Sequence, residues 1–188
     1  FSPVVRFETV RLMLALSALN KWHITGLDVR NAYLYGDLVE RIYMEQPEGF
    51  KAKGQEDKVL ILRKALYGLK QAGLVWWQTL DSYMKTLGFK RLSSDAGIFV
   101  RHGSDGSLVI AVIYVDDALF VGLDKALVNM LKNKFMQRWE CRDLGDTREF
   151  LCMRITRRGN KIFIYQCAYL DKVLAHCGMM NANVATMP

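Results

Sequence analysis

The segment LVIAVIYVDDALFV, residues 108–121, decides the fold predicted for this chain. Residues 108–113 and 118–121 are short and rich in β-branched or aromatic side chains, which is typical of buried strands. Asp116 and Asp117 lie between them, at the turn of a predicted hairpin. Because an unpaired buried carboxylate is costly, adjacent acids at such a place normally have a partner or a metal ion. The segment therefore indicates a divalent-cation site at a sheet edge, or a structural turn in which Asp is simply a favourable residue.

A third acid upstream, Asp28, favours the first of these interpretations. It ends a short predicted strand in the segment HITGLDVRNAYLYG, residues 23–36. If this strand lies beside the hairpin, Asp28, Asp116 and Asp117 meet at one edge of the sheet. Carboxylate oxygens suit Mg²⁺, and two such ions about 3.5–4 Å apart can clamp the reacting oxygens of a phosphoryl transfer. We therefore predict that these three acids are catalytic and bind metal.

Three ordered motifs in the chain resemble motifs A, B and C of reverse transcriptases. They are LDV with AYL in residues 27–34, KALYGLKQA at residues 64–72 and YVDD at residues 114–117. The middle motif and the segment IYMEQPEGF, residues 42–50, resemble specifically the polymerases of copia-type LTR retrotransposons. The resemblance runs from Phe1 to the C-terminus. It implies an RNA-directed DNA polymerase that adds a deoxynucleotide to a primer 3′-end with two Mg²⁺ ions, for which Mn²⁺ can substitute.

The resemblance also assigns roles to residues around the three acids. Val29 joins them as a metal-site residue, and Tyr33 would pack under the incoming sugar and exclude a 2′-hydroxyl. The alternatives are a core tyrosine at position 33 and a solvent-facing lysine at position 70. The residues expected to bind the nucleotide are Asn31, Ala32, Tyr33, Tyr67, Gly68 and Lys70, and those expected to contact the primer are Tyr114, Val115, Leu151, Cys152 and Met153.

Two positions depart from the pattern of the family. Gly73 stands where members commonly have Pro, so the helix around it is expected to begin less firmly. Cys152 stands where most members have Gly, in the strand that would grip the primer end. If this position requires a positive φ, Cys costs on the order of 1 kcal/mol or more, which puts the primer grip in doubt. Gly68, by contrast, keeps a glycine where a ligand would come close to the backbone.

Composition limits the remaining possibilities. The chain has 188 residues, 51% of them hydrophobic, which fits one domain or one domain with an appended piece. No apolar run approaches the roughly 20 residues that span a bilayer. The sequence shows neither an initiating Met nor a signal peptide, so we expect a fragment of a longer protein that is not secreted.

Nearly all of the net charge of +7 lies in residues 125–172, which contain eleven Lys and Arg against five acids. A basic half beside an acidic metal site fits a polyanion that lies across the domain. A solvated basic face explains the charge alone equally well.

The four cysteines, Cys141, Cys152, Cys167 and Cys177, form no CxxC pair and suggest neither zinc nor a disulfide framework. We interpret them as free thiols in a reducing compartment, most of them filling the core.

The hydrophobic pattern and the resemblance together predict an α+β fold. The expected architecture is an antiparallel sheet with helices packed mainly on one face, similar to the palm of a right-hand reverse transcriptase with incomplete fingers. We expect residues 1–140 to form the palm with residual fingers elements, and residues 141–188 to form the primer-grip hairpin and the start of the thumb or connection. Helices are predicted at residues 10–19 (buried on several sides), after Asp28, and at 74–87, 125–139 and 169–177. Strands are predicted before Asp28 and at 42–44, 59–62, 98–100, 108–113, 118–121, 149–155 and 161–165. A frayed tail is predicted from Asn181.

The resemblance implies partners as well. These are an RNA or DNA template with its primer, deoxynucleoside triphosphates, and the remainder of a Pol polyprotein, with fingers strands upstream and RNase H downstream. A homodimer stays open, and no membrane is implied. The expected location is a cytoplasmic virus-like particle or the nucleus. The fragment alone is expected to be weak or inactive, and two other classes stay open: a catalytically inactive nucleic-acid-binding remnant of a retroelement, and a structural module.

Overall fold

The hairpin around residues 114–117 forms the middle of a six-stranded antiparallel sheet. The computed structural model describes residues 2–182. The strand order in the sheet is β4-β5-β6-β7-β1-β8. The elements, in chain order, are α1 (Phe7–Leu19), β1 (His23–Val29), the short 3₁₀ helix η1 (Ala32–Tyr35), β2 (Asp37–Glu45), β3 (Val59–Lys64), α2 (Ala72–Thr86), β4 (Lys90–Arg91), β5 (Ile98–His102), β6 (Leu108–Tyr114), β7 (Asp117–Gly122), α3 (Lys125–Arg138), β8 (Cys141–Gly145), β9 (Glu149–Phe150), β10 (Met153–Arg158), β11 (Lys161–Tyr165) and α4 (Cys167–His176).

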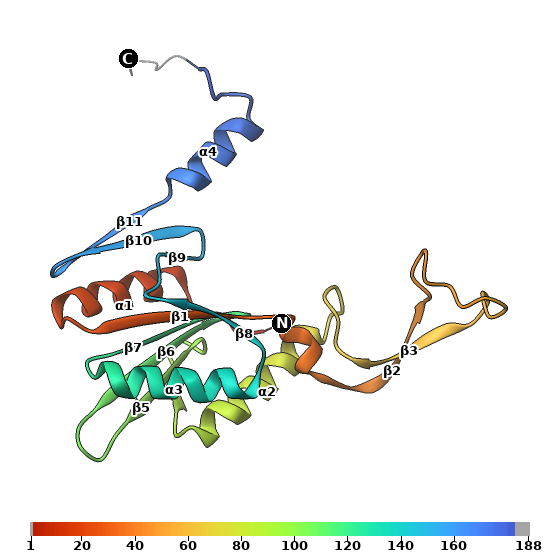
Figure 1. Ribbon diagram of the computed structural model, residues 1–188, viewed down its shortest axis with the longest axis horizontal. Helices are drawn as coiled ribbons and strands as arrows, with labels where there is room; N and C mark the ends of the chain where they lie inside the picture. The colour runs from red at the N-terminus through yellow and green to blue at the C-terminus, as the bar shows by residue number, and fades with distance from the viewer. Residues whose placement is uncertain (1, 183–188) are drawn as a thin grey trace.

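Side-chain alternation along the central strands divides the core between the two faces of this sheet. On one face, Leu27 and Phe120 pack with Trp76 of α2 and Phe135 of α3. On the other face, α1 and the small sheet β11-β10-β9 cover the strands, with Leu14 among the buried side chains. Figure 1 shows α2 and α3 below the sheet and α1 above it. The antiparallel sheet is confirmed, and the strands predicted at 98–100, 108–113 and 118–121 form the three-strand meander β5-β6-β7. Two of the three helices that pack on the sheet share one face.

Three helix predictions are wrong in detail. Helix α1 buries only one side, because Leu12 is 54% and Leu19 is 80% exposed, so it is a surface helix. In α2 the fully buried tryptophan is Trp76, whereas the apolar spacing of residues 74–87 predicts Trp77 on the core-facing side, and Trp77 is only partly buried. The short helix predicted after Asp28 is only the four-residue 3₁₀ segment η1.

The strand predicted at residues 149–155 is interrupted. Residues Leu151 and Cys152 form a turn between β9 and β10, with φ angles of 50° and 61°. Strands β10 and β11 then pair as predicted, from Arg158↔Lys161 to Arg154↔Tyr165. Strand β8, which sequence patterns did not predict, pairs with β1 and completes the large sheet.

Two parts of the chain extend away from the sheet (Figure 1). The β2–β3 hairpin projects from one end, and α4 extends from the other with no buried residue. Cys152, Cys167 and Cys177 are exposed and Cys141 is half-buried, so the prediction that the cysteines fill the core is wrong. Within residues 2–182, no helix combines the length and apolar character needed to cross a bilayer. The tail predicted from Asn181 lies mostly outside the described residues.

Candidate active site

The pairing of β1 with β7 brings together acids that lie far apart in the sequence. Asp28, near the end of β1, is the cross-strand partner of Asp117, the first residue of β7. Side chains of directly opposed residues lie on one face of a sheet with their Cβ atoms about 4.5–5.5 Å apart. Asp116 occupies the adjoining two-residue turn between β6 and β7. The three predicted acids therefore meet at one end of the sheet, with Asp117 in the strand and not in the turn.

This turn has an unusual backbone, which two hydrogen bonds fix. Val115 has a φ of 56°, a left-handed conformation that is unfavourable for a β-branched residue. Its carbonyl oxygen accepts a hydrogen bond of 2.8 Å from the indole Nε1 of Trp76. The Val29 amide donates to the carbonyl oxygen of Asp116, also at 2.8 Å. The buried helix α2 and the neighbouring strand β1 thus hold the turn in place.

The acids affect each other electrostatically. Burial raises the pKa of Asp117 to about 6, and the negative charges of Asp116 and Asp28 add to this rise. Neighbouring carboxylates repel one another when they are ionised, so a cation placed among them stabilises their ionised forms. The donor set therefore fits a hard divalent ion such as Mg²⁺, with Asp28 and Asp116 as the natural ligands and Asp117 beside them.

The acids do not, however, form a closed metal cage. Across the described residues, no three His, Cys, Asp or Glu side chains are grouped closely enough to hold a metal ion between them. Mg²⁺ usually takes only one or two protein carboxylates and fills its shell with water and phosphate oxygens. An open group of acids is thus compatible with an ion that arrives with its substrate.

Two tyrosines from different segments line the approach to the acids. The rings of Tyr33 and Tyr67 lie with their centroids 4.3 Å apart. The Tyr67 hydroxyl donates to Oδ2 of Asp116 over 3.5 Å, and burial together with Asp116 raises the pKa of both phenols. Tyr33 is half-buried beside the core, whereas Tyr67 is 56% exposed. The predicted nucleotide-binding tyrosines are therefore adjacent to each other and to one candidate metal ligand.

The other predicted nucleotide-site residues lie in the same region but differ in exposure. Asn31 is exposed and left-handed, with a φ of 51°, and Ala32 is fully buried. Gly68 has a φ of 99°, and a Cβ there would meet no protein atom within 4 Å, so its backbone conformation is what favours glycine. Lys70 is exposed in the loop before α2.

The predicted primer-contacting residues form two separate groups. Tyr114, at the end of β6, is the cross-strand partner of Asp117 and belongs to the acidic end of the sheet, as does Val115. Leu151 and Cys152 form the β9–β10 turn, and Met153 is buried in the core. Among the described residues, no hydrogen bond or ion pair joins this second turn to the three acids. Its positive φ at Cys152 meets the condition under which Cys is less favourable than Gly.

Sequence reasoning missed two supports of the site. The hydrogen bond from Trp76 was not predicted, because its indole donor cannot be matched to the Val115 carbonyl without the tertiary structure. The buried ammonium of Lys132 bonds both carboxylate oxygens of Asp143, at 2.7 and 2.8 Å, and the hydroxyl of Thr25 at 3.0 Å. This network ties α3 to both β1 and β8. In the sequence, the only sign of this network is a lysine within the otherwise apolar face of α3.

Comparisons with known proteins identify the family of this chain. The profile of the family "Reverse transcriptase (RNA-dependent DNA polymerase)" matches residues 1–188. The chain is 40% identical to the "Retrovirus-related Pol polyprotein from transposon TNT 1-94" of Nicotiana tabacum over 190 residues, which cover 100% of this chain and 14% of the relative. It is 37% identical to the polyprotein from transposon RE1 of Arabidopsis thaliana, covering 100% of this chain and 13% of the relative.

A shorter relative shows the same similarity. The "Putative transposon Ty5-1 protein YCL074W" of Saccharomyces cerevisiae is 35% identical over 134 residues, covering 71% of this chain and 43% of that protein. No solved structure matches the chain. The chain spans about one seventh of the plant polyproteins that it matches, across its whole length and at 37–40% identity. It belongs to the reverse transcriptase (RNA-dependent DNA polymerase) family, as found in the Pol polyproteins of copia-type retrotransposons.

Proposed function

We propose that this chain is the palm region of a retrotransposon reverse transcriptase, in which Asp28, Asp116 and Asp117 support two-metal nucleotidyl transfer to a primer 3′-end. The observation that carries this proposal is the register of β1 against β7. It pairs Asp28 with Asp117 and places Asp116 in the adjoining turn.

In the proposed reaction, the primer 3′-oxygen attacks the α-phosphorus of a deoxynucleoside triphosphate and pyrophosphate leaves. Two Mg²⁺ ions, or Mn²⁺ in their place, would supply charge neutralisation at the attacking and leaving oxygens. Asp28 and Asp116 would hold these ions, with Val29 beside them, and Asp117 would tune their charge. Tyr33 and Tyr67, whose rings are in contact, would form the floor below the incoming sugar and base.

The remaining assignments are part of the same proposal. Residues 1–140 would form the palm with residual fingers, and residues 141–188 the primer-grip hairpin and the start of the thumb. The template and primer, the deoxynucleoside triphosphates and the fingers and RNase H regions of the polyprotein would be the partners, with a homodimer as a further possibility. The enzyme would act in a cytoplasmic virus-like particle or in the nucleus.

The test is Mg²⁺-dependent primer extension on an RNA template, with this chain and with a version extended upstream along the polyprotein. The extended form should incorporate nucleotides, and Asp116→Asn should abolish incorporation without unfolding the protein. Asp171→Asn, which removes an exposed carboxylate from α4, is the matched control and should leave the rate unchanged. Incorporation by the Asp116→Asn variant at the unmodified rate would refute the proposal.

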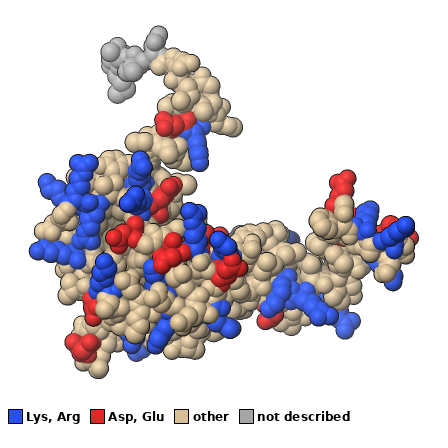
Figure 2. All heavy atoms as spheres, in the orientation of Figure 1, with Lys and Arg blue, Asp and Glu red and all other residues tan. Residues whose placement is uncertain are grey.

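A second candidate is a catalytically inactive nucleic-acid-binding remnant. The observation in its favour is the basic segment 125–172. Figure 2 shows Lys and Arg side chains gathered over the part of the surface formed by β10 and β11. A remnant of this kind would bind nucleic acid with equal affinity with or without Mg²⁺ and in the Asp116→Asn variant, and salt would weaken that binding steeply.

A further inference from the structure

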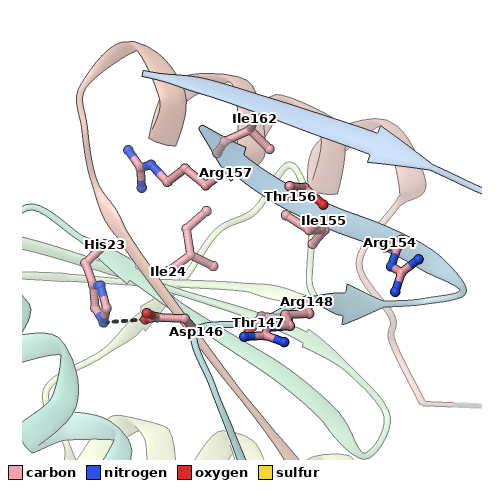
Figure 3. A pocket seen from close by; sticks show the side chains of 10 residues that line it. All are labelled: His23, Ile24, Asp146, Thr147, Arg148, Arg154, Ile155, Thr156, Arg157 and Ile162. Carbon is pink, nitrogen blue, oxygen red and sulfur yellow. Dashed lines mark ion pairs between the residues drawn. The ribbon is translucent and has the colours of Figure 1, made fainter. Parts of the chain in front are cut away.

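A polar cavity lies at the opposite end of β1 from Asp28. Its volume is about 540 Å³, and it lies between the start of β1, the segment before β9, and the β10–β11 hairpin. Figure 3 shows its lining side chains. The residues that line it are His23, Ile24, Asp146, Thr147, Arg148, Arg154, Ile155, Thr156, Arg157 and Ile162.

The lining combines cations with an apolar floor. In Figure 3, Ile24, Ile155 and Ile162 lie between β1 and the β10–β11 hairpin, with His23 and Asp146 at one side of the view and Arg154 at the other. Three arginines and one carboxylate, Asp146, are among the lining residues, and Oδ1 of that carboxylate lies 3.9 Å from Nε2 of His23. An apolar floor keeps water away from one side of a bound group, which strengthens its attraction to the surrounding charges.

The three arginines are held differently. The guanidinium of Arg157 donates to the carbonyl oxygens of Trp22 and Ser17, which fixes it at the end of α1. The side chains of Arg148 and Arg154 are exposed, and within the described part of the chain neither makes a hydrogen bond or an ion pair. One fixed and two adjustable guanidinium groups around a cavity suit a tetrahedral oxyanion, because Arg pairs with phosphate through two parallel N–H donors.

The cavity also shares a sheet face with the candidate active site. Alternate residues of β1 point to the same side, so Ile24 and Asp28 face the same way. The start of β1 lies roughly 16 Å from Asp28, at about 3.3 Å per residue. A nucleic-acid strand that reaches Asp28 could place another of its phosphates at this distance.

We propose that this cavity is a phosphate-binding site in which Arg148 and Arg154 close on a phosphate group from outside while Arg157 and the two threonine hydroxyls line it from within. The phosphate belongs to a nucleotide unit, either in the backbone of a nucleic-acid strand or free. The site is separate from the three acids, so it does not depend on the proposed polymerase reaction.

His23 provides a reporter inside the cavity. Burial and the positive charges of Lys125, Lys132 and Arg157 lower its pKa, against the opposing effect of Asp146. A phosphate bound beside the ring adds negative charge and should therefore raise the pKa of His23. His102 and His176 lie elsewhere, on β5 and α4, and serve as internal controls in the same spectrum.

The experiment measures binding with the full chain in the absence of Mg²⁺ and of deoxynucleoside triphosphates, so failure of the polymerase proposal would not affect it. Fluorescent single-stranded DNA and a primer–template duplex are titrated at several salt concentrations. The test variant is the double substitution Arg148→Gln/Arg154→Gln. The control is Arg138→Gln, which removes one positive charge from the opposite side of the sheet. NMR titration of the three histidines is run with inorganic phosphate and with each nucleic acid.

Two results would support the site and identify the source of the phosphate. For a backbone phosphate, the double variant should bind several-fold more weakly, with a salt slope lower by about 0.9 per lost contact for a duplex or about 0.7 for a single strand, and nucleic acid should raise the pKa of His23. For free phosphate, inorganic phosphate alone should raise the pKa of His23 in the unmodified chain but not in the double variant, and strand binding should be unchanged. Equal strand binding in all variants, with no movement of His23 by either ligand, would overturn the proposal.

Discussion

The indole Nε1 of Trp76 donates a 2.8 Å hydrogen bond to the carbonyl oxygen of Val115, the residue that precedes the two adjacent acids. Trp76 is fully buried between helix α2 and the sheet, and its ring packs against those of Tyr35 and Trp139. The bond therefore connects a rigid part of the core directly to the left-handed turn that carries Asp116. A turn in this strained conformation persists only where its surroundings hold it.

Replacing Trp76 by Phe should loosen this turn. The carbonyl oxygen of Val115 would lose its buried donor, and the free energy of unfolding should fall by about 1–3 kcal/mol from the hydrogen bond, with more from the smaller ring. Denaturant unfolding measures the loss. If the polymerase proposal holds, primer extension by the extended form should slow as well.

Trp77→Phe is the matched control for this substitution. The indole nitrogen of Trp77 is buried without a hydrogen-bond partner in the described structure. Removing that donor costs no hydrogen bond, so Trp77→Phe should destabilise the chain much less than Trp76→Phe. Equal losses in the two variants would show that the bond to Val115 contributes nothing.

The raised pKa of Asp117 predicts a particular dependence of stability on pH. The unfolded chain releases this proton near 3.8 and the folded chain near 6, so between these values the native state binds more protons. The contribution of protonated Asp117 to the free energy of unfolding is therefore fully present below pH 3.8 and is lost as the pH rises through 6. Asp117→Asn, which cannot ionise, should therefore be more stable than the unmodified chain at pH 7.5, with no difference below about pH 4. The full shift corresponds to about 3 kcal/mol, and solvent screening of this partly exposed carboxylate makes the expected gain smaller.

Urea unfolding across this pH range measures the difference. Mg²⁺ should stabilise the unmodified chain at pH 7.5 and should have less effect on Asp117→Asn. The exposed Asp57→Asn, in the loop between β2 and β3, is the control and should follow the unmodified curve. Parallel curves for Asp117→Asn and the unmodified chain would contradict the prediction.

The sequence predicted best where local chemistry determines the structure. The β6–β7 hairpin was predictable because two apolar segments flank a short polar one, and the meander follows from the same alternation. The position of Asp28 beside Asp117 needed more than periodicity. The resemblance to the ordered reverse transcriptase motifs implied it, and the pairing of β1 with β7 produces it.

The predictions from sequence failed where contacts between distant residues, or turns without a local sequence signal, determine the structure. Adjacent Trp76 and Trp77 are equally apolar, so periodicity could not determine which of them faces the core. The turn at Leu151 and Cys152 contains neither Gly nor Asn, the residues that normally mark a positive φ, and an uninterrupted strand was predicted there. Strand β8 pairs with β1 and is tied to α3 by the bond between Lys132 and Asp143, and no local pattern indicates these contacts between distant residues.

Cys152→Gly should stabilise the chain. Cys152 has a φ of 61°, where a side chain is unfavourable and glycine is not, so the gain should be about 1 kcal/mol. Thermal unfolding under reducing conditions measures it. The same substitution at Cys177, whose φ is −81° at the end of α4, is the control and should give no gain. Equal effects at both cysteines would mean that the turn conformation is not the cause.

Asp143→Ala should destabilise the chain strongly, because it leaves the ammonium of Lys132 buried without its charge partner. The Lys132 side chain is only 5% exposed, whereas that of Asp143 is 46% exposed. Breaking a buried pair typically costs about 3–5 kcal/mol, and partial exposure of Asp143 places the expected loss near the lower end. Asp37→Ala is the matched control, because its pair with Lys64 is exposed on both sides and should contribute less than about 1 kcal/mol.

The double variant Lys132→Met/Asp143→Ala should regain much of the stability, since it removes the buried charge itself. If the double variant is no more stable than Asp143→Ala, the loss comes from the Asp143–Gly145 backbone contact and not from an uncompensated lysine.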